Sequence, residues 1–468
     1  MLQFGARSVL LFLTLPIAAP CCFAAERIDL SRGLVPNDLA RVSIELEAGG
    51  HNLVRTASDG KAAAVDQKLP MSVSARLEYD ELRLASSAAD MEVQDGSLLA
   101  VRYYEKAEAV LKVDESGRTP QLADDRRLIA VASDNGRAVL YSPDGPLPRE
   151  QIDLLEVVAN SLFAEDLLPT EPVANGDTWE HDPAPMGAFL ALDSVAVCEV
   201  KSVLDEYNAN FAKVRLAGVV HGMCDGAATE LEVRALYLFD RRLRRITRLH
   251  LAVREKRSIG GATPGVEAVA KLQMKIEPLK ASKRLSPDVV SKATAAERTP
   301  TGDVLYEAAP LGFRIRHDRQ WFVTGEQRES VMLRRVDRGD LVAQCTLTAL
   351  PPKSAGRQVT LEQFQKDVTF SLGKSFGELV SSRQWQNAAG HYCFELVARG
   401  LVEEVPVEWH YYLVAPESGH RVSAAVTIEK PMVERVAGAD RELVESLELF
   451  PRMPAAQTAA QPKDQAVK

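Results

Sequence analysis

One short motif in this sequence has the residue types of a hydrolytic site. Residues 373–377 read Gly-Lys-Ser-Phe-Gly, which fits the G-x-S-x-G pattern of a serine nucleophile. That pattern needs a strand before the serine and a helix after it, whereas here a helical pattern precedes the motif and a strand pattern follows. We therefore interpret the glycines as the C-terminal cap of a helix over residues 360–372. The enzymatic alternative is an envelope hydrolase that uses Ser375 with a nearby histidine such as His391.

The histidines are not spaced like metal ligands. No pair has H-E-x-x-H or H-x-H spacing, and none stands in a recognisable cluster with acidic or thiol ligands. Lys374 and Ser375 after a glycine also resemble a phosphate-binding loop, but Val368 occupies the place of that loop's first glycine. The sequence therefore predicts no catalytic residue, no metal and no cofactor.

Basic side chains gather in one stretch of the chain. Guanidinium groups pair bidentately with phosphate and carboxylate groups, so such a stretch could bind a cell-wall polymer or a phospholipid headgroup. The alternative is a solvated basic face without a ligand. The four residues at the predicted hairpin turn are Arg241, Arg242, Arg244 and Arg245.

The first 25 residues predict export. Arg7 precedes an apolar run over residues 9–20, and small residues lead up to Glu26, which is the layout of a secretory signal peptide. The run is shorter than the roughly 20 apolar residues that span a bilayer. We therefore expect cleavage after Ala24 or Ala25 and a soluble periplasmic or secreted protein. Lipidation of a cysteine near the cleavage site is the alternative.

Four cysteines would remain after cleavage, two in each half of the chain. In an oxidising compartment this even split predicts two disulfides. The alternative is four separate buried thiols. None of the spacings is C-x-x-C, which argues against zinc and against thioredoxin-like redox chemistry. The predicted pairs are Cys198 with Cys224 and Cys345 with Cys393.

Composition sets broad limits on the protein. A chain of 468 residues with 46% hydrophobic residues is long and apolar enough for two or three folded domains. The formal net charge is −9, and an acidic balance argues against nucleic acid or an anionic membrane as the main partner.

Alternation of apolar and polar residues dominates the first part of the chain. It runs from about residue 38 to 140, changes to a helical period between residues 146 and 169, and resumes as far as residue 276. We predict an α+β protein in which residues 26–278 form one large antiparallel sheet, strongly curved or nearly closed around a helical insertion. Such a domain could hold an apolar ligand or a partner strand.

The alternation is lost over residues 279–304, which we predict to be a linker with a short helix that begins at Ser286. A second domain follows over residues 305–450, with strands, a helix opened by a capping box at Thr360, further strands and a closing helix. This order predicts an antiparallel sheet flanked by helices. Residues 451–468 are predicted to be a disordered tail.

Two resemblances accompany these patterns. Residues 311–316, Leu-Gly-Phe-Arg-Ile-Arg, followed by Trp321, resemble the start of PsbP-like domains, which implies a sheet sandwiched by helices and a role in partner binding or assembly without catalysis. Residues 173–179, Val-Ala-Asn-Gly-Asp-Thr-Trp, and Phe239 followed by an aspartate are similar to segments of uncharacterised secreted β-rich proteins of planctomycete type. This second resemblance implies fold and compartment only.

We therefore expect an exported, non-enzymatic binding or assembly protein of the bacterial cell envelope, with a protein or envelope component as its partner. The hydrolase with Ser375 is one alternative. A lipid carrier with a half-open β-barrel is the other, and it requires an apolar cavity of about 300 to 1,000 Å³ in the first domain.

Overall fold

The computed structural model describes residues 26–33, 38–56, 65–84, 97–134, 136–295, 303–354 and 359–452. The predicted signal peptide and most of the predicted tail lie outside these residues. The described chain consists mainly of large antiparallel sheets with several helices, which confirms the broad α+β prediction. None of its described helices has the length and apolar character needed to cross a bilayer.

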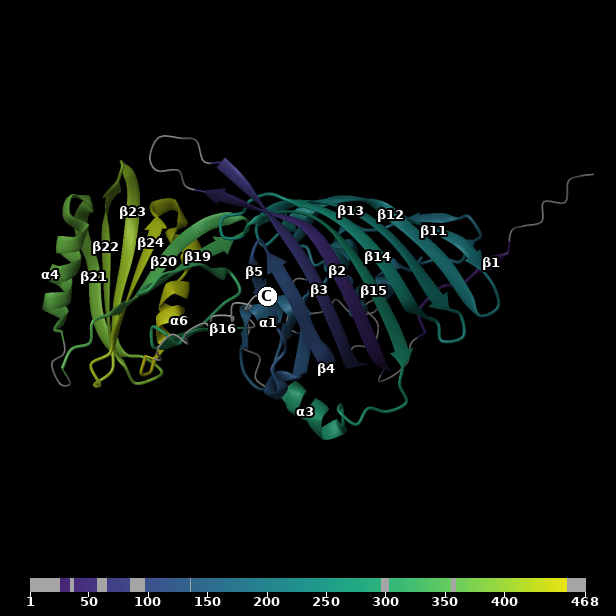
Figure 1. Cartoon of the computed structure of the whole chain (residues 1–468), viewed down its shortest axis with the longest axis horizontal. Coiled ribbons are helices and arrows are strands. Elements are labelled where there is room, and N and C mark those ends of the chain that lie inside the picture. Colours follow the sequence, from purple (N-terminus) through teal and green to yellow (C-terminus); the bar gives the residue numbers. More distant parts are fainter. Residues whose placement is uncertain are drawn as a thin grey trace, which may run out of the picture.

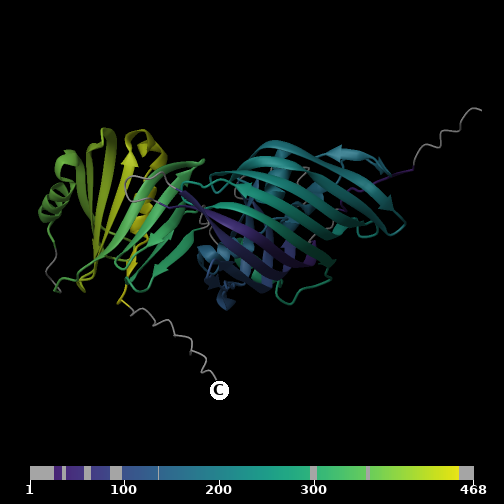
Figure 2. The same cartoon turned by 45° about the horizontal axis from the view of Figure 1, so that its top comes forward.

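The larger sheet has twelve strands among the described residues, and all of its neighbouring strands run antiparallel. It is strongly curved (Figures 1 and 2). The strand order leaves β10 and β7 at its two ends, so the sheet is open. In order, the strands are β10 (Thr178–Glu180), β11 (Ser194–Tyr207), β12 (Phe211–Cys224), β13 (Ala227–Asp240), β14 (Arg245–Arg257), β15 (Gly265–Pro278), β2 (Leu39–Thr56), β3 (Val65–Arg83), β4 (Leu98–Val113), β6 (Leu128–Asp134) and β7 (Arg137–Tyr141), with β5 (Ser116–Arg118) beside β4.

The alternation seen in the sequence sorts side chains between the two faces of this sheet. In β2, Val42 and Ile44 are buried, whereas the next residue, Glu45, is exposed. The buried face packs against α1 (Arg149–Leu155), η2 (Ser161–Leu167) and α2 (Pro183–Leu190). Ile152 and Phe189 from these helices are almost fully buried, so the centre of the concave face is filled by the protein's own side chains. This is the place where a lipid carrier would need its cavity.

The single helix predicted between residues 146 and 169 is wrong, because the chain breaks it in two. Helix α1 ends at Leu155, Ala159 has a φ of 60°, and Asn160 then caps η2 by accepting from the Leu162 amide. The helix α2, with proline at its first position, was not predicted.

A buried charge network explains the break. Arg83 donates from Nη1 to Glu165 of η2 at 2.8 Å, and Arg102 donates from Nη2 to the side chain of Asn160 at 2.6 Å. Glu81 lies between both arginines. Burial would raise the pKa of Glu81, but the charges of Arg102 and Arg83 outweigh it and lower the pKa. These contacts hold η2 against the sheet in place of a continued α-helix.

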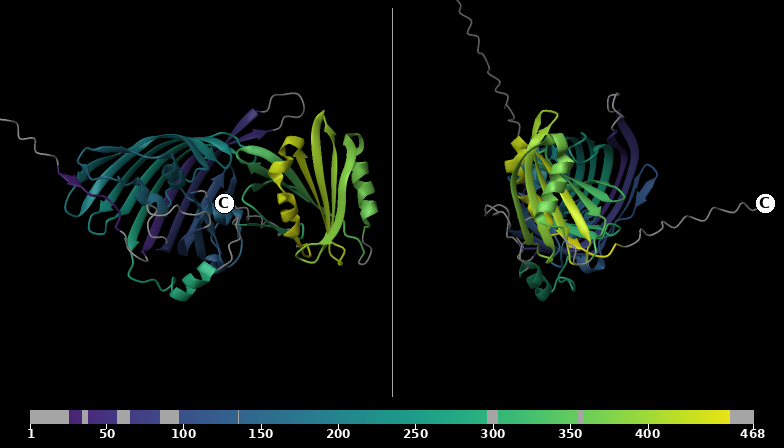
Figure 3. Two further views of the ribbon diagram at one scale, coloured as in Figure 1. Left: turned by 180° about the vertical axis from the view of Figure 1, so that it is seen from behind. Right: turned by 90° about the vertical axis from the view of Figure 1, so that its left-hand side faces the viewer.

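A second sheet has seven strands among the described residues, again antiparallel, with α4 (Leu361–Leu372) on one face and α5 (Val433–Val436) and α6 (Ala439–Glu445) on the other (Figure 3). The predicted cap of α4 is confirmed, since Thr360 Oγ1 accepts from the Gln363 amide at 3.2 Å. Gly373 ends the helix with a φ of 52°. In order, the strands are β18 (Trp321–Glu326), β19 (Ser330–Asp337), β20 (Asp340–Leu350), β24 (Arg421–Glu429), β23 (Val405–Ala415), β22 (Tyr392–Val402) and β21 (Phe376–Gln386).

A small third sheet joins the two large ones. Its strands are β25 (Glu448–Leu449), β17 (Phe313–His317), β16 (Val304–Ala308) and β8 (Leu147–Pro148), and β8 pairs parallel with β16. The remaining short elements are β1 (Arg27–Ile28), which pairs with β9 (Val173–Ala174), and the turns η1 (Asp124–Arg126), η3 (Gly373–Ser375) and η4 (Lys430–Met432).

The predicted linker contains the expected short helix, α3 (Pro287–Ala295). Ala293 and Leu285 are buried against Val101 and Leu128 of the first sheet. The described part of this segment, up to residue 295, is therefore anchored to the first sheet through these two side chains.

Candidate functional site

The second sheet carries an open cleft of about 490 Å³ between β21, β22 and β23 and the α5–α6 segment. We name it the charged cleft. Alternation along the strands places its side chains on one face, and the register sets Arg383 opposite Glu395, and Glu395 opposite Tyr412. Its ionisable residues are Arg383, Glu395, Glu408, His410, Tyr412, Asp440 and Arg441, with Arg399 at its margin.

His410 is held by two carboxylates. Its Nδ1 lies 2.6 Å from Asp440 Oδ2 and its Nε2 lies 2.9 Å from Glu408 Oε1. Burial would lower the pKa of His410, but the hydrogen bonds and charges of Asp440 and Glu408 outweigh burial and raise the pKa to about 8. The same contacts lower the pKa of both carboxyl groups against the effect of burial. The ring is therefore an imidazolium at neutral pH, with both nitrogens donating.

Tyr412 continues this network toward β22. Its hydroxyl lies 2.9 Å from Glu395 Oε1 and also contacts Asp440 Oδ2. The hydroxyl carries one proton, so it donates to one of the two carboxylates at a time. Burial, followed by the carboxylate charges, raises the pKa of Tyr412 and keeps it a phenol.

Three arginines present their charge at the surface of the cleft. Arg383 donates from Nε to Glu395 Oε2, Arg441 lies 3.4 Å from Glu395 Oε1, and Arg399 donates from Nε to Glu408 at 2.7 Å. The side chains of Arg383, Arg399 and Arg441 are 42%, 49% and 45% exposed, whereas those of Glu395 and Glu408 are 3% and 8% exposed. The guanidinium groups thus meet water, and buried carboxylates fix their positions. Arg399 also lies 3.9 Å from the exposed carboxylate of Glu378.

This arrangement suits binding of an anion. Guanidinium groups held in place by carboxylates can donate their remaining N–H groups to a carboxylate or phosphate without losing much side-chain entropy. His410 has no free ring nitrogen to accept a proton. Within the described ranges, no group of three or more His, Cys, Asp or Glu side chains is suited to hold a metal ion.

No family model and no curated protein matches this chain. Among solved structures, the cyanobacterial PsbP (CyanoP) from Synechocystis sp. PCC 6803 is similar at 13% sequence identity over 32% of this chain and 92% of CyanoP, with a TM-score of 0.26. Lipovitellin is similar at 12% identity over 54% of this chain, with a TM-score of 0.28, and this chain spans 26% of the lipovitellin chain. Both likenesses are weak and concern the fold alone.

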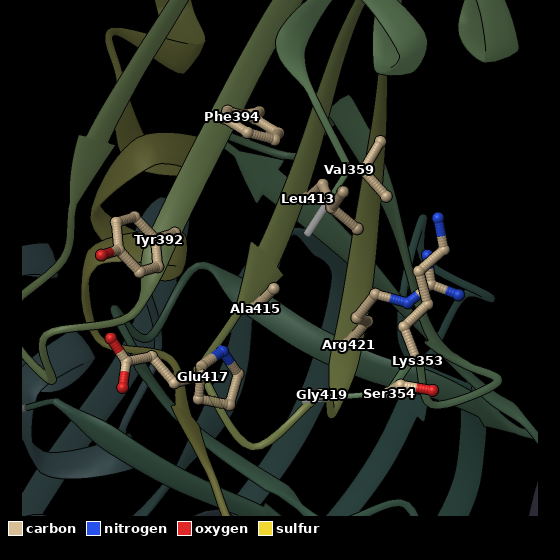
Figure 4. Close-up of a pocket in the computed structure, with 11 residues that line it drawn as sticks. Lys353, Ser354, Val359, Tyr392, Phe394, Leu413, Ala415, Glu417, Gly419 and Arg421 are labelled. Atoms are coloured by element: carbon tan, nitrogen blue, oxygen red, sulfur yellow. The ribbon is translucent and has the colours of Figure 1, made fainter. Parts of the chain in front are cut away.

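A second, smaller pocket lies on the opposite face of the same sheet, near α4 (Figure 4). Phe394 and Leu413 form its apolar wall, and Arg421 beside it donates to the Pro351 carbonyl. Its enclosed volume is about 20 Å³, which is enough for one water molecule and too little for an organic ligand.

The structure gives the four arginines predicted as an anion site different surroundings. Arg245 is buried and donates to Asp38 at 2.8 Å, whereas Arg244 is exposed and pairs with Asp29 at 3.0 Å. Arg241 donates to the Asn208 carbonyl. Arg245 is therefore withdrawn from solvent, and Arg241 and Arg244 have partners within the protein, so the run does not present four free guanidinium groups.

The hydrolase pairing of Ser375 with His391 is wrong. Ser375 directly precedes β21, whose first residue Phe376 lies opposite Gly400. His391 precedes β22 at the other end of the same ladder, nine residues before Gly400, or about 30 Å at about 3.3 Å per residue. The His391 ring instead accepts from the Leu449 amide at 3.1 Å.

Both predicted disulfides are wrong, because all four cysteines are free. Strands β24 and β23 lie between Cys345 and Cys393, which sets them at least about 14 Å apart at about 4.8 Å per strand. Cys198 lies opposite Val220, four residues from Cys224. A disulfide needs Cα atoms about 4.4 to 6.8 Å apart.

The residues of the charged cleft were missed by the sequence analysis. One signal was present, since Glu408, His410 and Tyr412 occupy alternate positions of a strand whose other residues are mostly apolar. Polar residues at every second position, on the face that was expected to meet a helix, indicate a polar site on a sheet.

Proposed function

We propose that this chain is an exported, non-enzymatic binding protein of the bacterial cell envelope, and that its charged cleft holds an acidic group of its partner. The observation that carries the proposal is the set of three half-exposed guanidinium groups fixed by buried carboxylates. Charge-assisted hydrogen bonds of this kind contribute about 1.5 to 3 kcal/mol each.

The finer parts of the proposal concern the two sheets. We propose that the second sheet with its helices is a PsbP-like module for protein association and that the first sheet is its scaffold. The motif over residues 311–316 with Trp321 supports the module. Trp321 is almost fully buried in the core of the second sheet, which is consistent with a structural role for this motif.

Binding to acidic probes tests this function. The full mature chain is titrated in a calorimeter with a soluble glutamate-rich peptide and separately with inorganic phosphate, which distinguishes a carboxylate ligand from a phosphate ligand. We expect Arg441→Ala or Arg399→Ala to weaken binding roughly tenfold or more. Arg328, an exposed arginine in the turn between β18 and β19, gives the control variant Arg328→Ala. Equal affinities for all variants would contradict the proposed function.

A further inference from the structure

Strand β21 is an open edge of the second sheet. It pairs with β22 on one side and is the last strand of the order among the described residues. Nine of its eleven residues are exposed. An edge strand of this kind presents unpaired backbone groups to any extended segment that approaches it.

The hydrogen-bond pattern between β21 and β22 shows which backbone groups of β21 are left unpaired at the edge. Asn387, just after β21, donates its amide to the His391 carbonyl at 3.0 Å. Bonded and non-bonded pairs alternate along an antiparallel ladder, so Arg383 is bonded to β22. The backbone groups of Ser382, Gln384 and Gln386 therefore point away from the sheet. Irregularities in the ladder near Gly377 and Val380 limit this regular edge to residues 381–386.

The charged cleft begins at the same edge. Val380, Ser381, Ser382 and Arg383 of β21 form one wall of the cleft. The Arg383 guanidinium lies 5.6 Å from the centre of the Trp385 ring, the next residue on that face. A side chain on an added strand opposite Arg383 would have its Cβ about 4.5 to 5.5 Å from that of Arg383, and would thus enter the cleft.

We infer that the partner binds by adding an extended, acidic segment to the edge of β21, with its carboxylates turned toward Arg383 and the charged cleft. This inference rests on the proposed function of the cleft and names its partner class, an acidic peptide segment. Main-chain hydrogen bonds to Ser382, Gln384 and Gln386 supply the affinity, and the positive cleft selects the charge. Net positive charge on the exposed side of the cleft is what favours an acidic segment over a neutral or basic one.

The geometry of strand addition allows a sharp test with matched peptides. In a seven-residue peptide that alternates threonine and glutamate and pairs antiparallel to β21, the glutamates reach the cleft when the threonine amides bond to β21. In antiparallel pairing, the residue that bonds Gln384 shares its face of the sheet, and the residue opposite Arg383 does not bond. Methylating the threonine nitrogens blocks this mode. Methylating the glutamate nitrogens leaves it intact, with the same composition and charge.

We expect the unmodified and the glutamate-methylated peptides to bind the full mature chain with similar affinity, and the threonine-methylated peptide to bind at least roughly tenfold more weakly. Amide hydrogen exchange at Ser382, Gln384 and Gln386 should slow when the unmodified peptide binds. Arg383→Gln should weaken binding, and Arg328→Gln should not. A peptide that replaces glutamate by lysine should not bind.

Each other outcome overturns the inference. Equal binding of the two methylated peptides, with Arg441→Ala still harmful, would leave an anion site without strand addition, so the proposed function would survive alone. If no acidic probe binds, both strand addition and the proposed function are contradicted. Slow exchange at the three edge amides in the free protein, together with a dimer in sedimentation, would show that a second copy of the chain occupies β21.

Discussion

His410 on β23 and Asp440 on α6 are joined by a hydrogen bond of 2.6 Å between Nδ1 and Oδ2. Thirty residues separate them in the chain. This bond ties the start of α6 to the middle of the second sheet and closes one side of the charged cleft. The shape of the cleft therefore depends on a group whose pKa is raised to about 8.

The stability of the second sheet should fall in alkaline solution. A His410 pKa raised from 6.5 to about 8 contributes stability that is complete below pH 6.5 and is lost as the pH rises through 8. The size is about 2 kcal/mol. Urea unfolding of the full chain at pH 6 and pH 9.5 measures it. His410→Gln should remove most of this pH dependence; a variant with the same pH dependence as the natural chain would contradict the assignment.

Trp321 should matter more for stability than Trp179. Trp321 is 1% exposed in the core of the second sheet, so Trp321→Ala should cost about 3 to 5 kcal/mol. Trp179 is only partly buried and donates from Nε1 to the Leu167 carbonyl. Thermal unfolding of both alanine variants should rank them in this order. Equal shifts in the midpoint would show that partial exposure does not lessen the role of Trp179.

Glu81 should be required for folding of the first sheet. It is buried between Arg83 and Arg102, and loss of one member of a buried ionic group costs about 3 to 5 kcal/mol. Glu81→Gln should therefore lower the unfolding midpoint strongly. Glu78, which pairs with Arg41 at the surface, is the matched control, and its exposed pair contributes about 0 to 1 kcal/mol. Similar losses for Glu78→Gln and Glu81→Gln would be inconsistent with the network.

The four cysteines after residue 26 should all be free thiols. When the protein is denatured without a reductant, all four should be alkylated, which mass spectrometry measures. In the native state Cys345 should react slowest, because it is completely buried and burial raises its pKa. Cys198, which is partly exposed, should react faster. A mass two units per bridge below that of the reduced chain would restore the disulfide prediction.

Local patterns were enough to predict most of the elements. The alternation around Val42 and the capping residue Thr360 report on the backbone at their own positions, and the structure confirms both. The charged cleft could not be predicted in this way. Its formation depends on the register that sets Glu395 opposite Tyr412 and on the docking of Asp440 from α6. Such contacts join residues whose separation in sequence carries no periodic signal.

The errors share a cause. Arg244 and Arg245 are neighbours in sequence, but one meets solvent and the other Asp38 in the interior. Cys345 and Cys393 each lie on a predicted strand, but two other strands separate them. Composition along the chain does not specify the strand order. The arginine site was therefore predicted from proximity in sequence, and the disulfides from the even division of cysteines between the two halves.

The seam between β2 and β15, where Ile44 lies opposite Met274, bears on how the chain reaches its native state. Strand β2 has a neighbour on one side early in synthesis, but its second neighbour exists only when the chain beyond Pro278 is available. Pairings between such distant segments are slow to form, because the entropy of closing a large loop is lost before any stabilising contact forms. Until β15 pairs with β2, the apolar side chains of Val42 and Ile44 lack their neighbours on one side. The amino-terminal hairpins should therefore be the segments that most need a chaperone until the rest of the chain has been synthesised.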